Sequence, residues 1–506
     1  MRAIATIIVS LALLPALAAG VEFDTPHLSN AKGKVSVELG GQRFVNHGLV
    51  GAGRLSAGTV DFMGDTLGSF SSLAIDKASW KRVGDRYEGV MWTLPDRGRN
   101  DPGAGLFYDY AARLHRFRVR VRPYTGKPLP ADRASQRQVD IVPDGGIELR
   151  DFRGTPFTGA DPGTGTLVEN GITLPSPASG TGAGKVSIDA ESLQFTQDGG
   201  FYVGDEYSAS VFHFDPKGRL TGVIVPPAAV TPRRDGRIDF NSLTPPQTGR
   251  RNNQGVEGMS LSPHGTRLFV ALQSALLQDS ATGDASGRAD TRVIVYDVAN
   301  NPVPAQPIAH YVVQLPTYND AGKGKPANRT AAQSEIRAIN GHQFLMLSRD
   351  GNGLGTDNDK PIVYKSVLLV DTDGATNLAG TAYETDTTPV LRAADSIVLK
   401  ADIVPAHWVE LINMLAPAQL GRFGMNVATT PKNQPTTLSE KWEAMDLVSV
   451  RDASHPDDYL LFVGNDNDFI ARHCVMQGQA CDSTFDNDNM ILVYRLTLPT
   501  MQRSGR

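Results

Sequence analysis

The most informative pattern in the chain is a repeated pair of short apolar strands with polar residues at fixed places. In the clearest copy, Glu191 opens the strand 190–195, the turn Asp198-Gly199-Gly200 follows, and the strand 201–203 ends in Asp205 and Glu206. A third apolar strand, 211–214, comes next. Short apolar strands joined by tight turns predict one antiparallel sheet per copy.

The same pattern recurs further along the chain. Later copies open with an acid near the head of the first strand, at Glu257, Glu335 and Glu443. Their second strands end in polar residues, at Gln273, at Arg349 and Asp350, and at Asn465 and Asp466. An earlier, divergent copy has Ser71 and Ser72 in place of the acid, and its second strand ends at Asp96 and Arg97. The repeat spacing is irregular, and we assign the excess to loops.

A sheet that cannot bury both of its faces alone is stabilised by packing against its neighbours, and radial packing of such sheets gives a β-propeller. We therefore predict an all-β chain in which residues 20–506 form a single β-propeller domain. Five copies are visible, and we expect five to seven blades with six preferred. A sixth blade would combine the strand 34–39 with chain from elsewhere. The stretch 372–440 is expected to be an insertion with a short helix at 405–415.

The first residues predict export rather than a structural element. Arg2 precedes an apolar run at 3–14 that is too short to cross a bilayer, and Ala16-Leu17-Ala18 has the pattern that signal peptidase needs. We predict a signal peptide over residues 1–19, with cleavage after Ala18 or Ala19. No later stretch has the roughly 20 apolar residues of a membrane span. The expected location is the periplasm or the medium.

Charge and cysteine content limit the partners. Loss of Arg2 with the signal peptide changes the formal net charge from −5 to −6, which argues against nucleic acid and anionic membranes as partners. The expected partner is a small molecule, and the expected state is a monomer. Cys474 and Cys481 are the two cysteines, and an oxidising compartment favours a disulfide between them over free thiols.

The recurring acids predict a shared polar site. In an antiparallel pair the start of one strand lies beside the end of the next, so both sets of polar residues fall at the same end of each blade. Ionised carboxylates gathered there repel one another, and Ca²⁺ would relieve this because it binds six to eight oxygens. The candidate ligands are Glu191, Asp205, Glu206, Glu257, Glu335, Asp350, Glu443, Asn465 and Asp466. The alternative for any one of them is a turn-capping role.

Several of these segments resemble the phytase-like family known as "esterase-like activity of phytase". The resemblance covers residues 68–494. It is carried by Asp96-Arg97-Gly98, Gly204-Asp205-Glu206-Tyr207, Gly255-Val256-Glu257-Gly258, Ser348-Arg349-Asp350, Trp442-Glu443-Ala444-Met445 and Asn465-Asp466-Asn467-Asp468-Phe469. It implies an exported bacterial propeller whose Glu and Asp residues carry ester or phosphoester hydrolysis. The sequence departs from the family pattern at Ser192, Ser348 and Ala444.

We therefore expect a Ca²⁺-dependent hydrolase of phosphate or carboxylic esters. Glu257 would act as general base, while Arg97 and Arg349 would hold an anionic group of the substrate. Two alternatives stay open: a non-catalytic periplasmic binding or scaffold propeller with a structural calcium ion, and a lactonase-type enzyme on the same fold.

Overall fold

The structure is a computed structural model that describes residues 20–281, 287–356, 359–394, 396–428 and 434–502. The predicted signal peptide, residues 1–19, and its cleavage site at Ala18 or Ala19 lie outside the described residues. Among the helices of the described part, none has the length and apolar composition needed to cross a membrane.

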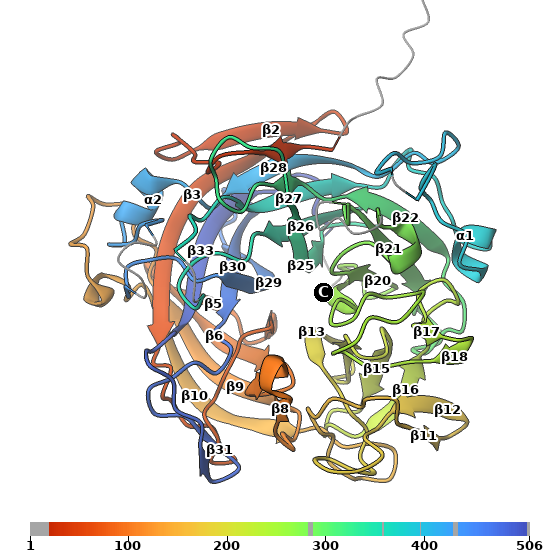
Figure 1. Cartoon of the computed structure of the whole chain (residues 1–506). Helices are drawn as coiled ribbons and strands as arrows, with labels where there is room; N and C mark the ends of the chain where they lie inside the picture. Colours follow the sequence, from red (N-terminus) through yellow and green to blue (C-terminus); the bar gives the residue numbers. More distant parts are fainter. Residues whose placement is uncertain (1–19, 282–286, 357–358, 395, 429–433, 503–506) are drawn as a thin grey trace, which may run out of the picture.

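The described strands form a β-propeller of four-stranded antiparallel blades around a central channel (Figure 1). The innermost strands are β4 (Ser72–Ile75), β13 (Ala190–Phe195), β19 (Val256–Leu261), β25 (Ala332–Ala338) and β29 (Lys441–Ser449). The second strands are β6 (Arg86–Leu94), β14 (Phe201–Asp205), β20 (Arg267–Leu272), β26 (Gln343–Arg349) and β30 (Asp458–Asp466). The third strands are β9 (Arg113–Val121), β15 (Val211–Phe214), β21 (Asp290–Asp297), β27 (Lys365–Asp371) and β33 (Asn489–Thr497). The outer strands are β10 (Val139–Glu148), β16 (Leu220–Ile224), β22 (Ala309–Gln314), β28 (His407–Asn413) and β3 (Gln42–Leu55). The predicted all-β propeller is confirmed.

The described strands give five blades, one fewer than the preferred six. The inner strands contact one another in the closed cycle β4, β13, β19, β25, β29 and back to β4. The strand predicted to found a sixth blade, β2 (Val35–Leu39), instead forms a hairpin with β3. β3 in turn pairs with β33, so the start of the chain completes the last blade. The N-terminal strands therefore close the ring.

Blades one and five also touch directly. The outer strands β10 and β3 meet in a parallel pair at Val139 and Gly53. A Cβ at Gly53 would lie 2.3 Å from the Val139 carbonyl oxygen. Only glycine allows this approach.

The helix predicted at 405–415 is wrong. Residues 407–413 form β28, which pairs antiparallel with β27 as the outer strand of the fourth blade. The segment is rich in the aromatic and β-branched residues that favour strands, such as Trp408, Val409 and Ile412. The predicted insertion therefore contains one blade strand. Its two short helices, α1 (Ala382–Thr385) and α2 (Pro417–Gly421), lie before and after that strand.

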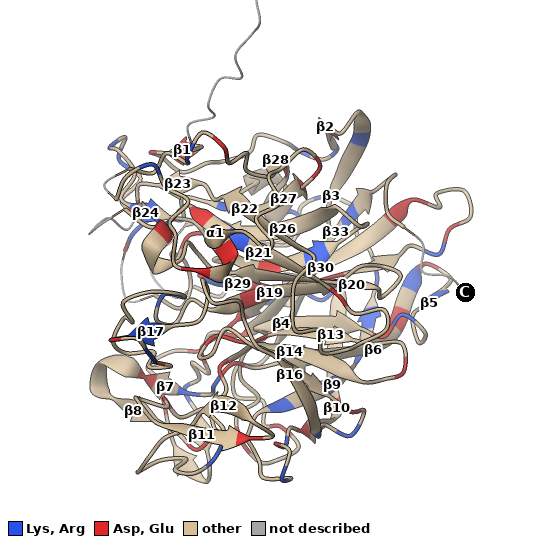
Figure 2. Ribbon diagram, turned by 90° about the vertical axis from the view of Figure 1, so that its right-hand side faces the viewer, with Lys and Arg blue, Asp and Glu red and all other residues tan. Residues whose placement is uncertain are grey.

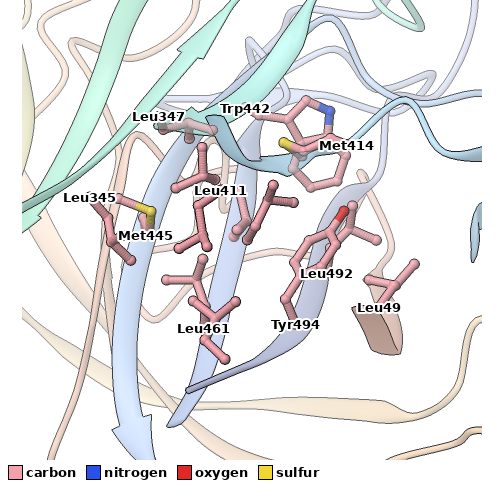
Figure 3. Packing of buried hydrophobic residues seen from close by; sticks show 14 of the residues in the cluster. Leu49, Leu345, Leu347, Leu411, Met414, Trp442, Met445, Leu461, Leu492 and Tyr494 are labelled. Atoms are coloured by element: carbon pink, nitrogen blue, oxygen red, sulfur yellow. The ribbon is translucent and has the colours of Figure 1, made fainter. Parts of the chain in front are cut away.

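The hydrophobic core lies between neighbouring blades. Figure 3 shows one part of it, where Trp442 and Met445 of β29 face Leu345 and Leu347 of β26. Trp442, Met445, Leu345 and Leu347 are fully buried. Burial of one such side chain contributes roughly 1.5–3 kcal/mol. Some blade strands are covered on both faces, and β27 is buried at every residue.

The disulfide predicted between Cys474 and Cys481 is confirmed. It closes the small hairpin of β31 (Val475–Met476) and β32 (Gln479–Ala480). Met476 of this hairpin packs against Phe469 and Tyr110. The bridge therefore secures the loop that follows the end of β30.

The insertion around α1 is tied to the third blade by buried charges. Arg292 of β21 forms an ion pair with Asp279, with Nη2 and Oδ2 2.7 Å apart. His310 of β22 lies between Arg292 and Glu384 of α1, with Nδ1 3.2 Å from Glu384 Oε2. Burial lowers the pKa of His310 to about 4, and the Arg292 charge acts in the same direction, although Glu384 opposes them. The imidazole is therefore neutral at pH 7.

This histidine predicts a loss of stability in mild acid. Unfolding releases His310 to its ordinary pKa of about 6.5, so the unfolded chain takes up a proton between pH 6.5 and 4 and the folded chain does not. We expect wild type to lose about 2 kcal/mol more unfolding free energy than His310→Gln between pH 7 and pH 5. Chemical denaturation at both pH values measures the difference. Equal losses in the two proteins would contradict a buried, neutral His310.

Candidate functional site

A β-bulge at the head of the inner strand sets the direction of the recurring acids. The pairing with the second strand skips one residue in four blades, and the skipped residues are Glu191, Glu257, Ser334 and Glu443. A bulge leaves its extra residue out of the ladder and turns its side chain away from the alternation of the strand. Three blades therefore present a glutamate at the same structural position.

These glutamates face a cavity of about 670 Å³ at one end of the channel, which we call the mouth cavity. Nine acidic and four basic side chains line it. The acidic residues are Asp96, Asp101, Asp189, Glu191, Glu206, Glu257, Glu443, Asp466 and Asp468, and the basic residues are Arg97, Arg99, Arg349 and Lys441. The lining also includes β7 (Asn100–Asp101), which lies with β8 (Leu106–Phe107) toward the left in Figure 2.

A larger cavity of about 1480 Å³ opens at the other end, where the inner strands finish. Its buried acid, Asp446, already forms ion pairs with Lys77 and Arg337. Uncompensated charge gathers at the mouth cavity instead, so we place the candidate site there.

Glycine makes the approach of two blades possible beside Glu257. A Cβ at Gly255 would lie 2.4 Å from the Glu206 carbonyl oxygen and 2.7 Å from its Cα. The backbone just before β19 therefore contacts the backbone just after β14, and this contact brings Glu206 next to Glu257. Backbone packing therefore requires glycine at position 255.

Most basic residues of the mouth cavity are already paired with acids. Arg97 Nη1 lies 3.0 Å from Asp189 Oδ2, and Arg349 forms an ion pair with Glu443. Lys441 Nζ lies 2.5 Å from Asp468 Oδ1 and 3.3 Å from Asp466 Oδ2. These ion pairs involve four of the nine acids that line the cavity, namely Asp189, Glu443, Asp466 and Asp468.

Five of the nine acids have no such ion pair among the described residues. Two are Asp96 and Asp101, and the other three are Glu191, Glu206 and Glu257, which we call the glutamate group. One carboxylate oxygen from each lies within 4.8 Å of the others. None of the three forms an ion pair with a described residue, and Glu206 Oε1 is buried without a hydrogen-bond partner among them. The glutamate group is therefore a compact set of three acids that no lysine or arginine of the described residues compensates.

The electrostatics of the glutamate group follow from burial and mutual repulsion. Burial raises the pKa of Glu206 to about 8, and the Asp189 charge adds to this rise. Burial also raises the pKa of Glu191 and of Glu257, with Glu257 acting on Glu191 and Glu206 acting on Glu257. All three shifts mean that negative charge is costly here unless a cation is present. Carboxylate oxygens at this spacing, one of them unpartnered, fit a hard divalent cation such as Ca²⁺.

The structure brings some of the predicted site residues together and places others elsewhere. Glu191, Glu206, Glu257, Glu443, Asp466, Arg97 and Arg349 all line the mouth cavity. Asp205, Glu335, Asp350 and Asn465 do not line it, and their assignment as ligands is corrected.

Glu335 lies one residue past the bulge of its strand, which is Ser334. Its side chain therefore points deeper into the channel, where Ser72 Oγ donates to Oε2 at 2.7 Å and Met259 N donates to Oε1 at 3.0 Å. A shift of one position in a strand exchanges the two faces. Glu335 links inner strands rather than joining the mouth cavity.

Asp205 caps the turn after β14. Its two oxygens accept from the backbone N–H groups of Asp189 and Ser208, at 2.9 and 2.7 Å, and from the Ser208 hydroxyl. The turn-capping alternative holds at this position.

Asp350 and Asn465 are also used internally. Asp350 is fully buried and forms an ion pair with Lys365 at 2.7 Å. Asn465 Nδ2 donates to Ser439 Oγ at 3.0 Å, and its Oδ1 accepts from the Met490 N–H. Neither side chain has an oxygen left for the cavity.

Asp189 and Lys441 line the mouth cavity but were not predicted as site residues. Each lies two positions before a bulged glutamate, Asp189 before Glu191 and Lys441 before Glu443. The available signal was therefore a charged residue two positions before two of the three bulged glutamates, since Glu257 has Gly255 at that position.

We expect Gly255→Ala to disrupt the site because the added methyl group would overlap the Glu206 backbone. The unfolding free energy should fall by about 1–3 kcal/mol, the typical cost of overpacking. Chemical denaturation measures this change. Gly351→Ala is the matched control, since a Cβ there meets nothing within 4 Å, and equal effects of the two changes would contradict the close approach.

One family sequence model matches residues 65–469, and it is described as "Phytase-like: Esterase-like activity of phytase". A protein of the fungus Arthroderma benhamiae, described as "Uncharacterized secreted protein", is 32% identical over 468 residues, which cover 86% of this chain and 89% of the relative. The resemblance implied a bacterial family, whereas this relative is fungal.

Two solved structures that the chain resembles are distant matches. The WD40 domain of Toxoplasma gondii coronin is 9% identical with a TM-score of 0.28, and 96% of this chain and 91% of that one are covered. The PQQ-bound aldose sugar dehydrogenase of Streptomyces coelicolor is 11% identical with a TM-score of 0.26, and 96% and 100% are covered.

Proposed function

Because the chain belongs to the phytase-like family, we propose that it is an exported, metal-dependent hydrolase of phosphate or carboxylic esters. The observation that carries the proposal is the glutamate group, in which three carboxylates lie within 4.8 Å of one another without an ion-pair partner among the described residues. The group opens into a cavity of about 670 Å³, which has room for a small ester.

Glu191, Glu206 and Glu257 would hold the cation, and Ca²⁺ is the expected ion because all the donor atoms are hard oxygens. When bound, such an ion polarises an ester oxygen and lowers the pKa of a water molecule. Glu443 and Asp466 line the same cavity but pair with Arg349 and Lys441. They are therefore proposed to hold those cations in place.

Glu257 is the proposed general base. Burial and the charge of Glu206 raise the pKa of Glu257, and a carboxylate with a raised pKa is a stronger base. Since a carboxylate has two oxygens, Glu257 can serve as both ligand and base.

Arg97 and Arg349 are proposed to hold an anionic oxygen of the substrate. Each is more than nine-tenths buried and already oriented by a carboxylate, Asp189 for Arg97 and Glu443 for Arg349. The Nε–H of each has no hydrogen-bond partner among the described residues. A bound anion would satisfy these donors.

Export is supported by the predicted signal peptide, by the disulfide and by the secreted description of the fungal relative. We propose a periplasmic or secreted monomer that acts on a small molecule.

The proposal predicts that chelation abolishes turnover. Purified protein treated with EDTA should lose hydrolysis of p-nitrophenyl phosphate or of a p-nitrophenyl carboxylic ester, and added Ca²⁺ should restore it. Release of p-nitrophenol measures the rate. A lower unfolding temperature after chelation, with no turnover in either state, would instead indicate a scaffold with a structural ion.

Glu257→Gln should lower turnover by about 10²–10⁴-fold, the usual contribution of a general base. Glu38→Gln is the matched control, because Glu38 is an exposed residue of β2 outside the mouth cavity. Unchanged turnover in Glu257→Gln would remove Glu257 from the mechanism.

A further inference from the structure

Besides an overlapping set of Asp96, Asp189 and Glu191, in which Asp189 pairs with Arg97, the mouth cavity contains another cluster of acids as compact as the glutamate group. Asp96, Asp466 and Asp468, which we call the aspartate group, each have an oxygen within 4.8 Å of the others. Asp466 is the last residue of β30, Asp468 lies two residues after it, and Asp96 lies two residues after the end of β6. The two groups differ in what compensates their charge.

An ammonium group lies against the aspartate group. Lys441 Nζ is 2.5 Å from Asp468 Oδ1 and 3.3 Å from Asp466 Oδ2. Although burial opposes it, the charges of Asp468 and Asp466 raise the pKa of Lys441 above its usual value. The ammonium therefore stays charged at neutral pH.

The backbone fixes this arrangement. Lys441 is the first residue of β29 and lies directly opposite Asp466 in the ladder with β30. Opposite charges at such a pair stabilise a sheet. Asp468 has a φ of 52° and its N–H donates to Asp466 Oδ1 at 2.6 Å. The turn thus directs both carboxylates toward one lysine.

The glutamate group has no equivalent of this lysine. The residue two positions before a bulged glutamate is Lys441 in the fifth blade, but it is Gly255 in the third and Asp189 in the second. Gly255 has no side chain, and Asp189 adds negative charge. The buried Glu206 Oε1, without a partner among the described residues, belongs to this group.

We propose that Lys441 is a built-in counter-cation that takes the place of a second divalent ion, so that the chain binds one such ion, at the glutamate group. This inference rests on the proposed function for the ion at the glutamate group, but the role of Lys441 can be tested separately. A lysine charge is not exchanged and is not removed by a chelator. One positive charge is thereby kept beside Asp466 and Asp468 at any calcium concentration.

The test is the calcium stoichiometry of the chelator-treated, full-length protein, measured by isothermal titration calorimetry with CaCl₂. Wild type should bind about one Ca²⁺ per chain. Lys441→Met, which keeps the length of the side chain and removes its charge, should bind about two. Lys441→Arg, which keeps the charge, should match wild type, and the double variant Lys441→Met with Asp468→Asn should lose the added site.

Each outcome decides the proposal. Two ions in wild type, or no added ion in folded Lys441→Met, would overturn the role of Lys441. No ion in wild type with one ion in Lys441→Met would support that role and would refute the ion at the glutamate group, so the two failures differ. If Lys441→Met unfolds without calcium, its unfolding temperature should rise with CaCl₂ more than that of Lys441→Arg, and equal rises would contradict the proposal.

Discussion

The mouth cavity depends on how the protein offsets the repulsion between carboxylates that its blades bring together. Buried ionised acids are costly, because each loses its hydration and raises the energy of its neighbours. Bulges create this problem, since they turn three glutamates of separate blades toward one cavity. The protein offsets part of the repulsion with Arg97, Arg349 and Lys441. The remainder is concentrated on the glutamate group, and a site that attracts a cation arises there.

The strands of the fold could largely be predicted from the sequence, and their assembly only in part. Apolar strands separated by glycine-rich turns, together with the cysteine pair, predicted the blades and the disulfide. The blade number depended on which distant strands pair, and a local pattern does not contain that information. The strand 35–39 therefore suggested a sixth blade, although it joins the fifth through β3. The stretch 405–415 was predicted as a helix, whereas residues 407–413 form a strand whose partner, β27, lies before a long excursion of the chain.

The site shows the same division at the level of single residues. Glu191, Glu257 and Glu443 were identified because they recur, and a recurring residue can be recognised in the sequence without knowing how the strands pair. Glu335 fits the recurrence but lies one residue past its bulge, and only strand pairing shows that difference. Asp205 has the same side chain as the candidate ligands, yet its oxygens are satisfied by the turn at Ser208. Residue type and spacing therefore indicated that the site lies at one end of the channel. The hydrogen bonds in the structure show which of the acids are free to bind a cation there.

The pairing of β3 with β33 has a consequence for how the chain assembles. Val45 lies beside Thr497 across this pair, so the last blade joins segments from opposite ends of the sequence. Contacts between such distant residues form slowly, because a large loop has to close first. During synthesis, β2 and β3 can pair with each other early, but the edge of β3 that pairs with β33 stays open until almost the whole polypeptide has been made. This open edge is then exposed to other chains, and a chaperone that shields unpaired strands would be most valuable to this protein at that stage.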